Sequence, residues 1–407
     1  MYKNAREKDM KKIIIYTLAV MLSSFTLAAC SNKADSGSEK KSESPASSGK
    51  QDSTVSEESD KFVIGGIGPL TGELSSYGIS VKQGAEYAVD EINASGGLKI
   101  GDKTYKVELD FKDDEGEPEK ALTAYTSLKS SGINALIGGV TSQSSMAVSD
   151  HTKDDYILQI SPCATAEGIT SNPNVFRLGF TDKQQAEVMA DYVDREDYEN
   201  IVLFYNESNE YSKSVHDAFV KSLNDKGKGS IITAEETFND GDNDFSNQFM
   251  DIDGSAQTLI VFFGYNNEAA ALIEQAKEFD NRSDFVGTDG MDLVIDKVSD
   301  PGVLDGTIFT SDFIPVMGGN KAEKFAIGYT GKYKETSNHF AAGGYDAVYA
   351  AAEAAKKAGG IDNNALVSAM SEISFEGASG EIKFDASGEA NQKVGLVYIE
   401  DGKYNAK

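Results

Sequence analysis

Short apolar runs alternate with amphipathic segments along the chain from Lys61 onward. Each apolar run ends in a glycine or polar turn, which is typical of buried strands. In the amphipathic segments the apolar residues recur at the spacing of one helical face, as Val81, Ala85, Ala88 and Val89 do. Strands that alternate with helices in this way predict parallel sheets with helices on both faces.

The alternation predicts elements in two successive runs, with a restart after Phe180. In the first run we expect strands at 62–64, 107–111, 135–137 and 156–160, and helices at 81–92, at 121–128 and from Met146 onward. The second run predicts strands at 201–205, 231–232, 259–263, 306–312, 381–385 and 394–400, and helices at 186–193, 215–223, 269–279, 321–335, 341–358 and 364–373.

The restart predicts two α/β lobes of similar build. Lobe 1 would hold residues 61–180 plus 312–384, and lobe 2 would hold residues 181–311 plus 385–407. The chain would then cross between the lobes three times, near residues 181–183, 310–313 and 385–390.

The first 60 residues do not share this alternation. Basic residues precede an apolar run at 13–27, which is short for a membrane span and predicts a signal peptide over residues 1–29. The run ends in Leu27-Ala28-Ala29-Cys30, which resembles a lipobox, so we expect Cys30 to be lipidated; an ordinary signal peptide with a chance cysteine is the alternative. The Ser-, Glu-, Lys- and Asp-rich residues 30–60 predict a flexible tether.

Composition narrows the function classes further. The chain has two cysteines, so a lipidated Cys30 leaves Cys163 without a disulfide partner. The net charge of −28 argues against nucleic-acid binding, which requires basic patches.

Polar side chains follow two neighbouring strands in the segment 134–165. Ser142 and Ser144 follow the strand at 135–137, and Thr165 follows the next strand along the chain. Hydroxyls beside the unpaired N–H groups of a helix N-terminus can bind a small anion, and ligands of open α/β sheets lie beyond such strand ends. The alternative is that these side chains only cap helices.

We expect the protein to have no enzymatic activity. The three histidines, His151, His216 and His339, have no partners at metal-binding spacing. There is no Gly-x-Ser-x-Gly motif, and the glycine turn around Pro69 differs from the dinucleotide fingerprint. We therefore expect no metal and no cofactor.

The order of the motifs resembles the type I periplasmic-binding protein superfamily, and more narrowly the leucine/isoleucine/valine-binding protein family of ABC importers. The resemblance runs from about Lys61 to the C-terminus and rests on Gly68-Pro69-Leu70-Thr71-Gly72, Tyr77-Gly78, Gly84-Ala85, Ala88-Val89-Asp90-Glu91-Ile92-Asn93, Gly96-Gly97, Ile137-Gly138-Gly139-Val140-Thr141-Ser142, Ile160-Ser161-Pro162, Ala164-Thr165-Ala166 and Gly287-Thr288-Asp289-Gly290. It implies two Rossmann-like lobes with parallel-rich sheets, joined by a three-segment hinge.

The resemblance also implies a site for a zwitterionic amino acid. Ser142, Thr165 and nearby main-chain N–H groups would hold the ligand carboxylate, and Asp289 with the main-chain carbonyl of Cys163 would hold the ammonium. Other implied site residues are Tyr77, Gln143, Ala164, Tyr211 and Tyr265.

Several of these residues have a second interpretation. Tyr77 can be loop packing, Asp289 can cap the following helix, and Cys163 can be a small buried apolar residue. Gln143, Cys163 and Asp289 differ from the usual family pattern, which leaves the ligand side chain open among branched aliphatic, aromatic and other small amino acids or amides.

The resemblance implies a monomeric solute-binding lipoprotein on the outer face of the membrane of a single-membrane bacterium, working with ABC permease subunits. The alternative is a sensory module of the same fold that binds an aromatic amino acid or amide and acts through a separate partner.

Overall fold

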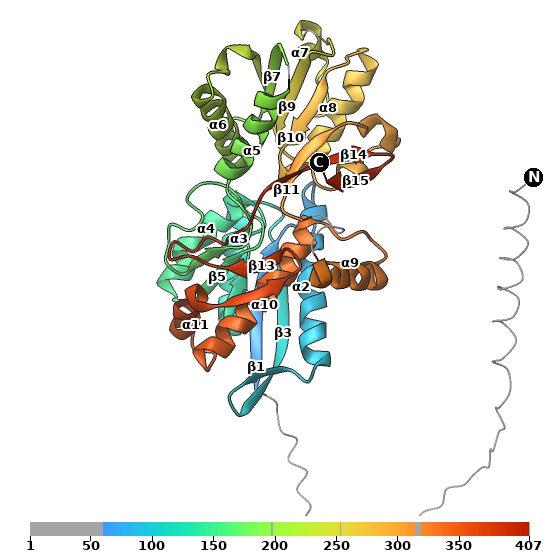
Figure 1. Cartoon of the computed structure of the whole chain (residues 1–407). Helices are drawn as coiled ribbons and strands as arrows, with labels where there is room; N and C mark the ends of the chain where they lie inside the picture. Colours follow the sequence, from blue (N-terminus) through green and yellow to red (C-terminus); the bar gives the residue numbers. More distant parts are fainter. Residues whose placement is uncertain (1–59, 197, 253, 314–318, 407) are drawn as a thin grey trace, which may run out of the picture. The chain divides into compact units, whose positions relative to one another are not determined.

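The computed structural model describes residues 60–196, 198–252, 254–313 and 319–406. The predicted signal peptide, the lipidated Cys30 and the tether lie outside the described residues. Two sheets organise the described part (Figure 1).

The first sheet has six strands in the order β2-β3-β1-β4-β5-β6. All neighbours are parallel except β2 and β3, which form an antiparallel pair. The strands are β1 (Lys61–Gly68), β2 (Leu98–Ile100), β3 (Lys103–Asp113), β4 (Ala135–Ile137), β5 (Leu158–Ser161) and β6 (Val175–Arg177).

Side chains of each strand alternate between the two faces of this sheet. In β4, Ala135 and Ile137 pack with α2 (Ser75–Ala94) and α10 (His339–Ala358), whereas Leu136 packs with α3 (Pro118–Ser131) and α4 (Ser142–Asp154). The alternation follows from the two-residue period of a strand. Further elements packed into the core on the α2 side are α9 (Gly319–Tyr333), α11 (Asn363–Ala369) and the hairpin β12 (Ser374–Gly377) and β13 (Gly380–Lys383). We call this sheet and its helices the first lobe.

The second sheet has seven strands in the order β15-β14-β11-β10-β9-β7-β8. Strand β14 is antiparallel to both of its neighbours, β11 and β15, and the remaining pairs are parallel. The strands are β7 (Asn200–Tyr205), β8 (Ile232–Thr237), β9 (Thr258–Phe263), β10 (Asp284–Gly287), β11 (Ile308–Ser311), β14 (Gly395–Glu400) and β15 (Lys403–Ala406).

Helices cover both faces of the second sheet too. Helices α5 (Asp182–Arg195) and α6 (Glu210–Asp225) pack on one face, while α7 (Ser246–Asp251) and α8 (Asn266–Glu278) pack on the other. Five short 3-10 turns complete the described elements: Gly229–Ile231, Asp289–Met291, Val294–Lys297 (η3), Pro301–Leu304 and Met370–Glu372. We call this sheet and its helices the second lobe.

The chain visits the two lobes alternately. It leaves the first sheet after β6, enters the second with α5, returns to the first-lobe core with α9, and ends in β14 and β15 of the second sheet. The residue-level lobe boundaries given above stay a prediction.

The backbones of helices α2 and α10 are in direct contact. A Cβ on Gly84 would lie 1.9 Å from the carbonyl oxygen of Ala341, and one on Gly344 would lie 2.0 Å from that of Val81. Only glycine permits this approach. The contact fixes the N-terminal halves of the two helices relative to each other.

Some predicted element boundaries were wrong. Helix α4 begins at Ser142 rather than at Met146, because Thr141 caps it by accepting a hydrogen bond from the Ser144 N–H. The strand expected at 156–160 begins at Leu158, because Tyr156 has a positive φ of 57° and lies exposed in the preceding turn. Strands β2, β6, β12 and β15 were not predicted, since strands of three or four residues carry little periodic signal.

Candidate functional site

Eight of the predicted site residues line one small cavity of about 20 Å³. They are Tyr77, Ser142, Cys163, Ala164, Thr165, Tyr211, Tyr265 and Asp289. The cavity lies beyond the carboxyl ends of strands from both sheets, where α/β sheets place their ligands. Gln143 is half-buried and is not among the lining residues, and Cys30 lies outside the described residues.

The first-lobe side of the cavity offers hydrogen-bond donors. Because Thr141 is the cap of α4, the Ser142 hydroxyl does not serve as one; its Oγ accepts from the Ala166 N–H at 3.2 Å and keeps its proton for a ligand. Thr165 is only 1 % exposed, and its hydroxyl interacts with the Asp182 carboxyl beside the cavity and lowers the pKa of that group. These hydroxyls and the first-turn N–H groups of α4 suit a carboxylate.

The second-lobe side presents a buried carboxylate. Asp289 follows β10, accepts a hydrogen bond from Tyr211 Oη at 2.7 Å, and forms no salt bridge with any described residue. Burial raises its pKa, and the positive charge of His339 opposes that shift. A cation placed here would compensate the cost of burying this carboxylate.

Aromatic rings form the remaining wall. The Tyr77 ring lies 4.5 Å from Phe340 and 5.7 Å from Tyr265, and Tyr265 stacks on Tyr211 at 5.3 Å, all between ring centroids. The hydroxyls of Tyr77 and Tyr211 are already engaged in protein hydrogen bonds. The rings therefore offer apolar surface to a ligand rather than hydroxyl groups.

Sequence reasoning missed four lining residues: Val140, Thr141, Gly290 and Phe340. Gly290 lies inside a recognised motif, so the motif was a usable signal for it. Phe340 comes from α10, which is distant in sequence, and only the packing of α10 on α2 brings it to the site.

A buried ion pair also escaped the sequence analysis. His339 Nδ1 lies 2.5 Å from Asp312 Oδ1, and the His339 N–H donates to Asp292 at 3.1 Å. Burial lowers the pKa of His339, but the Asp312 carboxylate outweighs this effect and raises it well above the usual range. The imidazolium thus supplies positive charge behind Cys163 and Asp289.

Asp182 is a second buried carboxyl group beside the site. Its side chain is fully buried and accepts from Gln185 Nε2 at 3.0 Å, and its N–H donates to the Thr165 carbonyl at 2.9 Å. Burial raises the pKa of Asp182 to about 7. In the sequence it resembles an ordinary acidic residue in the first turn of a helix, which is why it was overlooked.

In the described part of the chain, no cluster of three His, Cys, Asp or Glu side chains is arranged to hold a metal ion. Nor does any described helix combine the length and apolarity needed to cross a membrane.

Two α/β lobes with parallel-rich sheets and a cavity at facing strand ends define the type I periplasmic-binding fold. Proteins of this class bind solutes between lobes that close about a hinge.

The chain belongs to the periplasmic binding protein family, whose model matches residues 61–403. It is 31 % identical over 348 residues to Leu/Ile/Val-binding protein homolog 3 of Brucella melitensis, covering 84 % of this chain and 92 % of that protein. It is 35 % identical over 252 residues to Leu/Ile/Val-binding protein BraC3 of Rhizobium johnstonii, covering 61 % of this chain and 67 % of that protein.

Comparison with solved structures gives the same family assignment. The branched-chain amino acid transporter substrate-binding protein LivJ of Streptococcus pneumoniae, in complex with isoleucine, superposes with a TM-score of 0.79 at 30 % identity, covering 85 % of this chain and 98 % of that one. The leucine-binding protein LivK of Thermotoga maritima gives a TM-score of 0.76 at 25 % identity, with coverage of 85 % and 97 %. The expected family and fold class are thus confirmed: the chain is a substrate-binding protein of the branched-chain amino acid ABC transporter family, and its relatives are binding proteins rather than enzymes.

Proposed function

We propose that the protein captures a branched-chain α-amino acid between its lobes and presents it to the permease subunits of an ABC importer. The observation that carries this proposal is that a donor-rich wall and a buried carboxylate, which has no salt-bridge partner among the described residues, line the same cavity. A zwitterion has a matching carboxylate and ammonium, and buried charges require such partners.

In this proposal the ligand carboxylate accepts hydrogen bonds from Ser142, Thr165 and the first-turn N–H groups of α4. The ammonium lies against Asp289 and the main-chain carbonyl of Cys163. The first set belongs to the first lobe and Asp289 belongs to the second, so one ligand contacts both lobes and favours their closure.

The ligand side chain would contact the rings of Tyr77, Tyr265 and Phe340. These rings offer apolar surface of the kind that packs against an aliphatic side chain. The names of the relatives, Leu/Ile/Val-binding proteins, and the isoleucine complex of LivJ point the same way.

The remaining parts of the proposal concern the membrane anchor and the segments that join the lobes. We propose that Cys30 carries the lipid that anchors a monomeric protein to the outer face of the membrane, with residues 30–60 as spacer. The two lobes would be joined near residues 181–183, 310–313 and 385–390.

A calorimetric panel tests the ligand assignment. The purified protein is titrated with leucine, isoleucine, valine and phenylalanine, and with two leucine analogues: leucinamide, which lacks the carboxylate, and 4-methylpentanoate, which lacks the ammonium. We expect the three branched-chain amino acids to bind most tightly and both analogues to bind at least about tenfold more weakly. A best ligand without a carboxylate, such as a sugar or polyamine, would contradict the proposal.

A further inference from the structure

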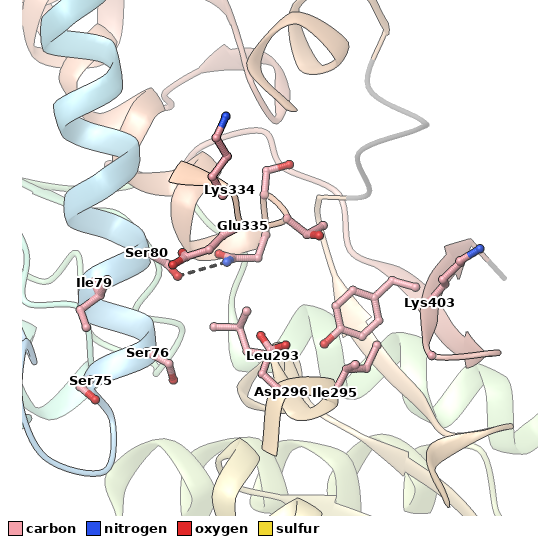
Figure 2. Close-up of a pocket in the computed structure, with 15 residues that line it drawn as sticks. Ser75, Ser76, Ile79, Ser80, Leu293, Ile295, Asp296, Lys334, Glu335 and Lys403 are labelled. Carbon is pink, nitrogen blue, oxygen red and sulfur yellow. Dashed lines mark hydrogen bonds between the residues drawn. The ribbon is translucent and has the colours of Figure 1, made fainter. Parts of the chain in front are cut away.

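The boundary between the lobes is open in one place. A cavity of about 770 Å³ lies there, with Ser76 and Ile79 of α2 on its first-lobe side and Ile295 and Asp296 of η3 on its second-lobe side (Figure 2). Side chains do not fill this part of the boundary, so contacts elsewhere hold the lobes in place. The segments along which the chain passes from one lobe to the other provide such contacts.

Two of these connecting segments run side by side. The first contains Arg177, the last residue of β6, and leads into α5 of the second lobe. The second, residues 384–394, connects β13 in the first-lobe core with β14 of the second sheet. The Arg177 N–H donates to the Gly388 carbonyl at 2.9 Å, and the Ala390 N–H donates to the Arg177 carbonyl at 3.0 Å. The two connecting segments are therefore paired through their backbones.

A buried ion pair joins the same two segments. The Arg177 side chain is 2 % exposed, and its guanidinium donates two hydrogen bonds to the Glu389 carboxylate, from Nε at 2.8 Å and from Nη2 at 2.6 Å. Thr170 Oγ1 donates to the same carboxylate at 2.7 Å. A bidentate pair of this kind is strong and geometrically specific, so Glu389 fixes the plane of the guanidinium.

The remaining nitrogen of the guanidinium, Nη1, reaches the loop at the carboxylate end of the amino-acid site. It donates to the main-chain carbonyls of Thr165 at 2.7 Å and Ala166 at 2.8 Å. The peptide between these two residues is planar and trans, so a Thr165 carbonyl held by Arg177 points the Ala166 N–H in the opposite direction. That N–H donates to Ser142 Oγ at 3.2 Å. Arg177 does not line the cavity, but it orients the loop that carries Thr165 and contacts Ser142.

We propose that Arg177 and Glu389 are positioning residues for amino-acid binding, which connect the paired segments between the lobes to the carboxylate end of the site. This role rests on the proposed function, because it concerns the groups that meet the ligand carboxylate. Glu389 holds the guanidinium, the guanidinium holds the loop peptide, and the peptide N–H holds the Ser142 hydroxyl. A change in the pair therefore acts on the carboxylate end of a ligand and not on its ammonium.

Glu389→Gln tests this role, because it keeps the shape of the side chain and removes the charge that fixes Arg177. Calorimetry measures the affinity of the purified variant for leucine and for leucinamide, which lacks the carboxylate. We expect leucine to bind at least about fivefold more weakly and leucinamide less than about twofold more weakly. Equal losses for the two ligands would overturn the proposal.

Asp155→Asn is the matched control. The Asp155 side chain is 21 % exposed, close to the 24 % of Glu389, and it forms an ion pair with Lys129 without lining the amino-acid cavity. This variant should bind both ligands as the unmodified protein does. A selective loss of leucine binding in the control as well would refute the special role of the Arg177–Glu389 pair.

A double-variant cycle separates positioning from a general structural role. If Glu389 acts through Ser142, Glu389→Gln should weaken leucine binding by a smaller factor in the Ser142→Ala background than in the unmodified protein. Losses that simply multiply would refute the connection.

Thr170→Val keeps the test decisive if Glu389→Gln does not fold. It removes a single hydrogen bond to the Glu389 carboxylate and should weaken leucine binding at least about twofold, again with a smaller effect on leucinamide. Failure of the unmodified protein to bind leucine would refute the proposed function and the positioning role together. Normal leucine binding that none of these variants changes would refute the positioning role alone.

Discussion

Tyr77 in the first lobe donates a hydrogen bond of 2.6 Å from its hydroxyl to the main-chain carbonyl of Gly290 in the second lobe. The same hydroxyl accepts from the Asn266 N–H at 2.8 Å. Both bonds are buried, and both connect the lobes directly, without a ligand. Tyr77 therefore lines the cavity and also holds the lobes together.

Replacing Tyr77 with phenylalanine keeps the ring and removes both bonds. Each hydrogen bond contributes about 0.5–1.5 kcal/mol, so the Tyr77→Phe variant should be less closed and bind the amino acid several-fold more weakly. Small-angle scattering measures the compaction and calorimetry the affinity. Tyr156→Phe, an exposed position, is the control. Unchanged scattering and affinity in Tyr77→Phe would show that the bonds do not contribute to closure.

Asp289→Asn keeps the shape of the side chain and removes the charge that faces the proposed ammonium. We expect a loss of about 2 kcal/mol or more in binding free energy, because the pair is desolvated. At saturating ligand the unmodified protein should compact in small-angle scattering, and the variant should compact less. Full compaction with unchanged affinity would exclude this role for Asp289.

Ser142→Ala and Thr165→Ala each remove a hydroxyl from the proposed carboxylate end. A hydrogen bond to a charged group contributes about 1.5–3 kcal/mol, so each variant should bind roughly tenfold to a hundredfold more weakly. Ser144→Ala provides the control, because Ser144 is buried in the same helix but does not line the cavity. If calorimetry gives the control the same loss, the effect comes from α4 and not from lost ligand contacts.

Asp182 should make folding stability depend on pH. Its folded pKa of about 7 exceeds the ordinary value of 3.8, so the native state holds this proton more tightly than the unfolded state. The resulting stabilisation is full below the unfolded pKa and is lost as pH rises through the folded pKa.

Asp182→Asn should therefore stabilise the protein more at pH 8 than at pH 4, by at most about 4 kcal/mol. Urea denaturation of both proteins at the two pH values measures this difference. Asp102→Asn is a control at an exposed carboxyl. The same change in stability at both pH values would mean that burial does not shift the pKa of Asp182 as described.

Cys30 can be tested in cells. If it is the lipidated first residue of the mature protein, Cys30→Ala should leave the protein unprocessed or release it from the membrane. Fractionation and mass spectrometry of the N-terminus follow both outcomes, with Cys163→Ala as the cysteine control. Normal processing and membrane attachment of Cys30→Ala would contradict the proposal.

Much of the fold could be predicted from the sequence because each local pattern agrees with the global arrangement. The strand at 135–137 was located to the residue, since three apolar residues end in a glycine turn. The start of α4 was misplaced because polar side chains, Ser142 to Ser145, form its buried first turn. Hydrophobic periodicity cannot detect a helix whose first turn is polar and buried.

The candidate site was also predicted only in part. The structure brings Ser142, Thr165 and Asp289 together, and motif order indicated all three. The His339–Asp312 pair could not be found this way, because its two residues are separated in sequence and joined only by tertiary packing. Neither residue lies in a motif, and burial, which gives the pair its importance, is a property of the folded chain.

The close contact of α2 and α10 has a consequence for how ligand preference can change. Tyr77 lies in the first turns of α2 and Phe340 in the first turn of α10, and Gly84 and Gly344 hold these helices at backbone contact. The spacing of the two rings is therefore set by Gly84 and Gly344, which do not line the amino-acid cavity. A methyl group at either glycine would clash with the backbone of the facing helix and push the two helices apart. The distance between the Tyr77 and Phe340 rings would then increase, so two positions away from the cavity control the width of the proposed ligand site.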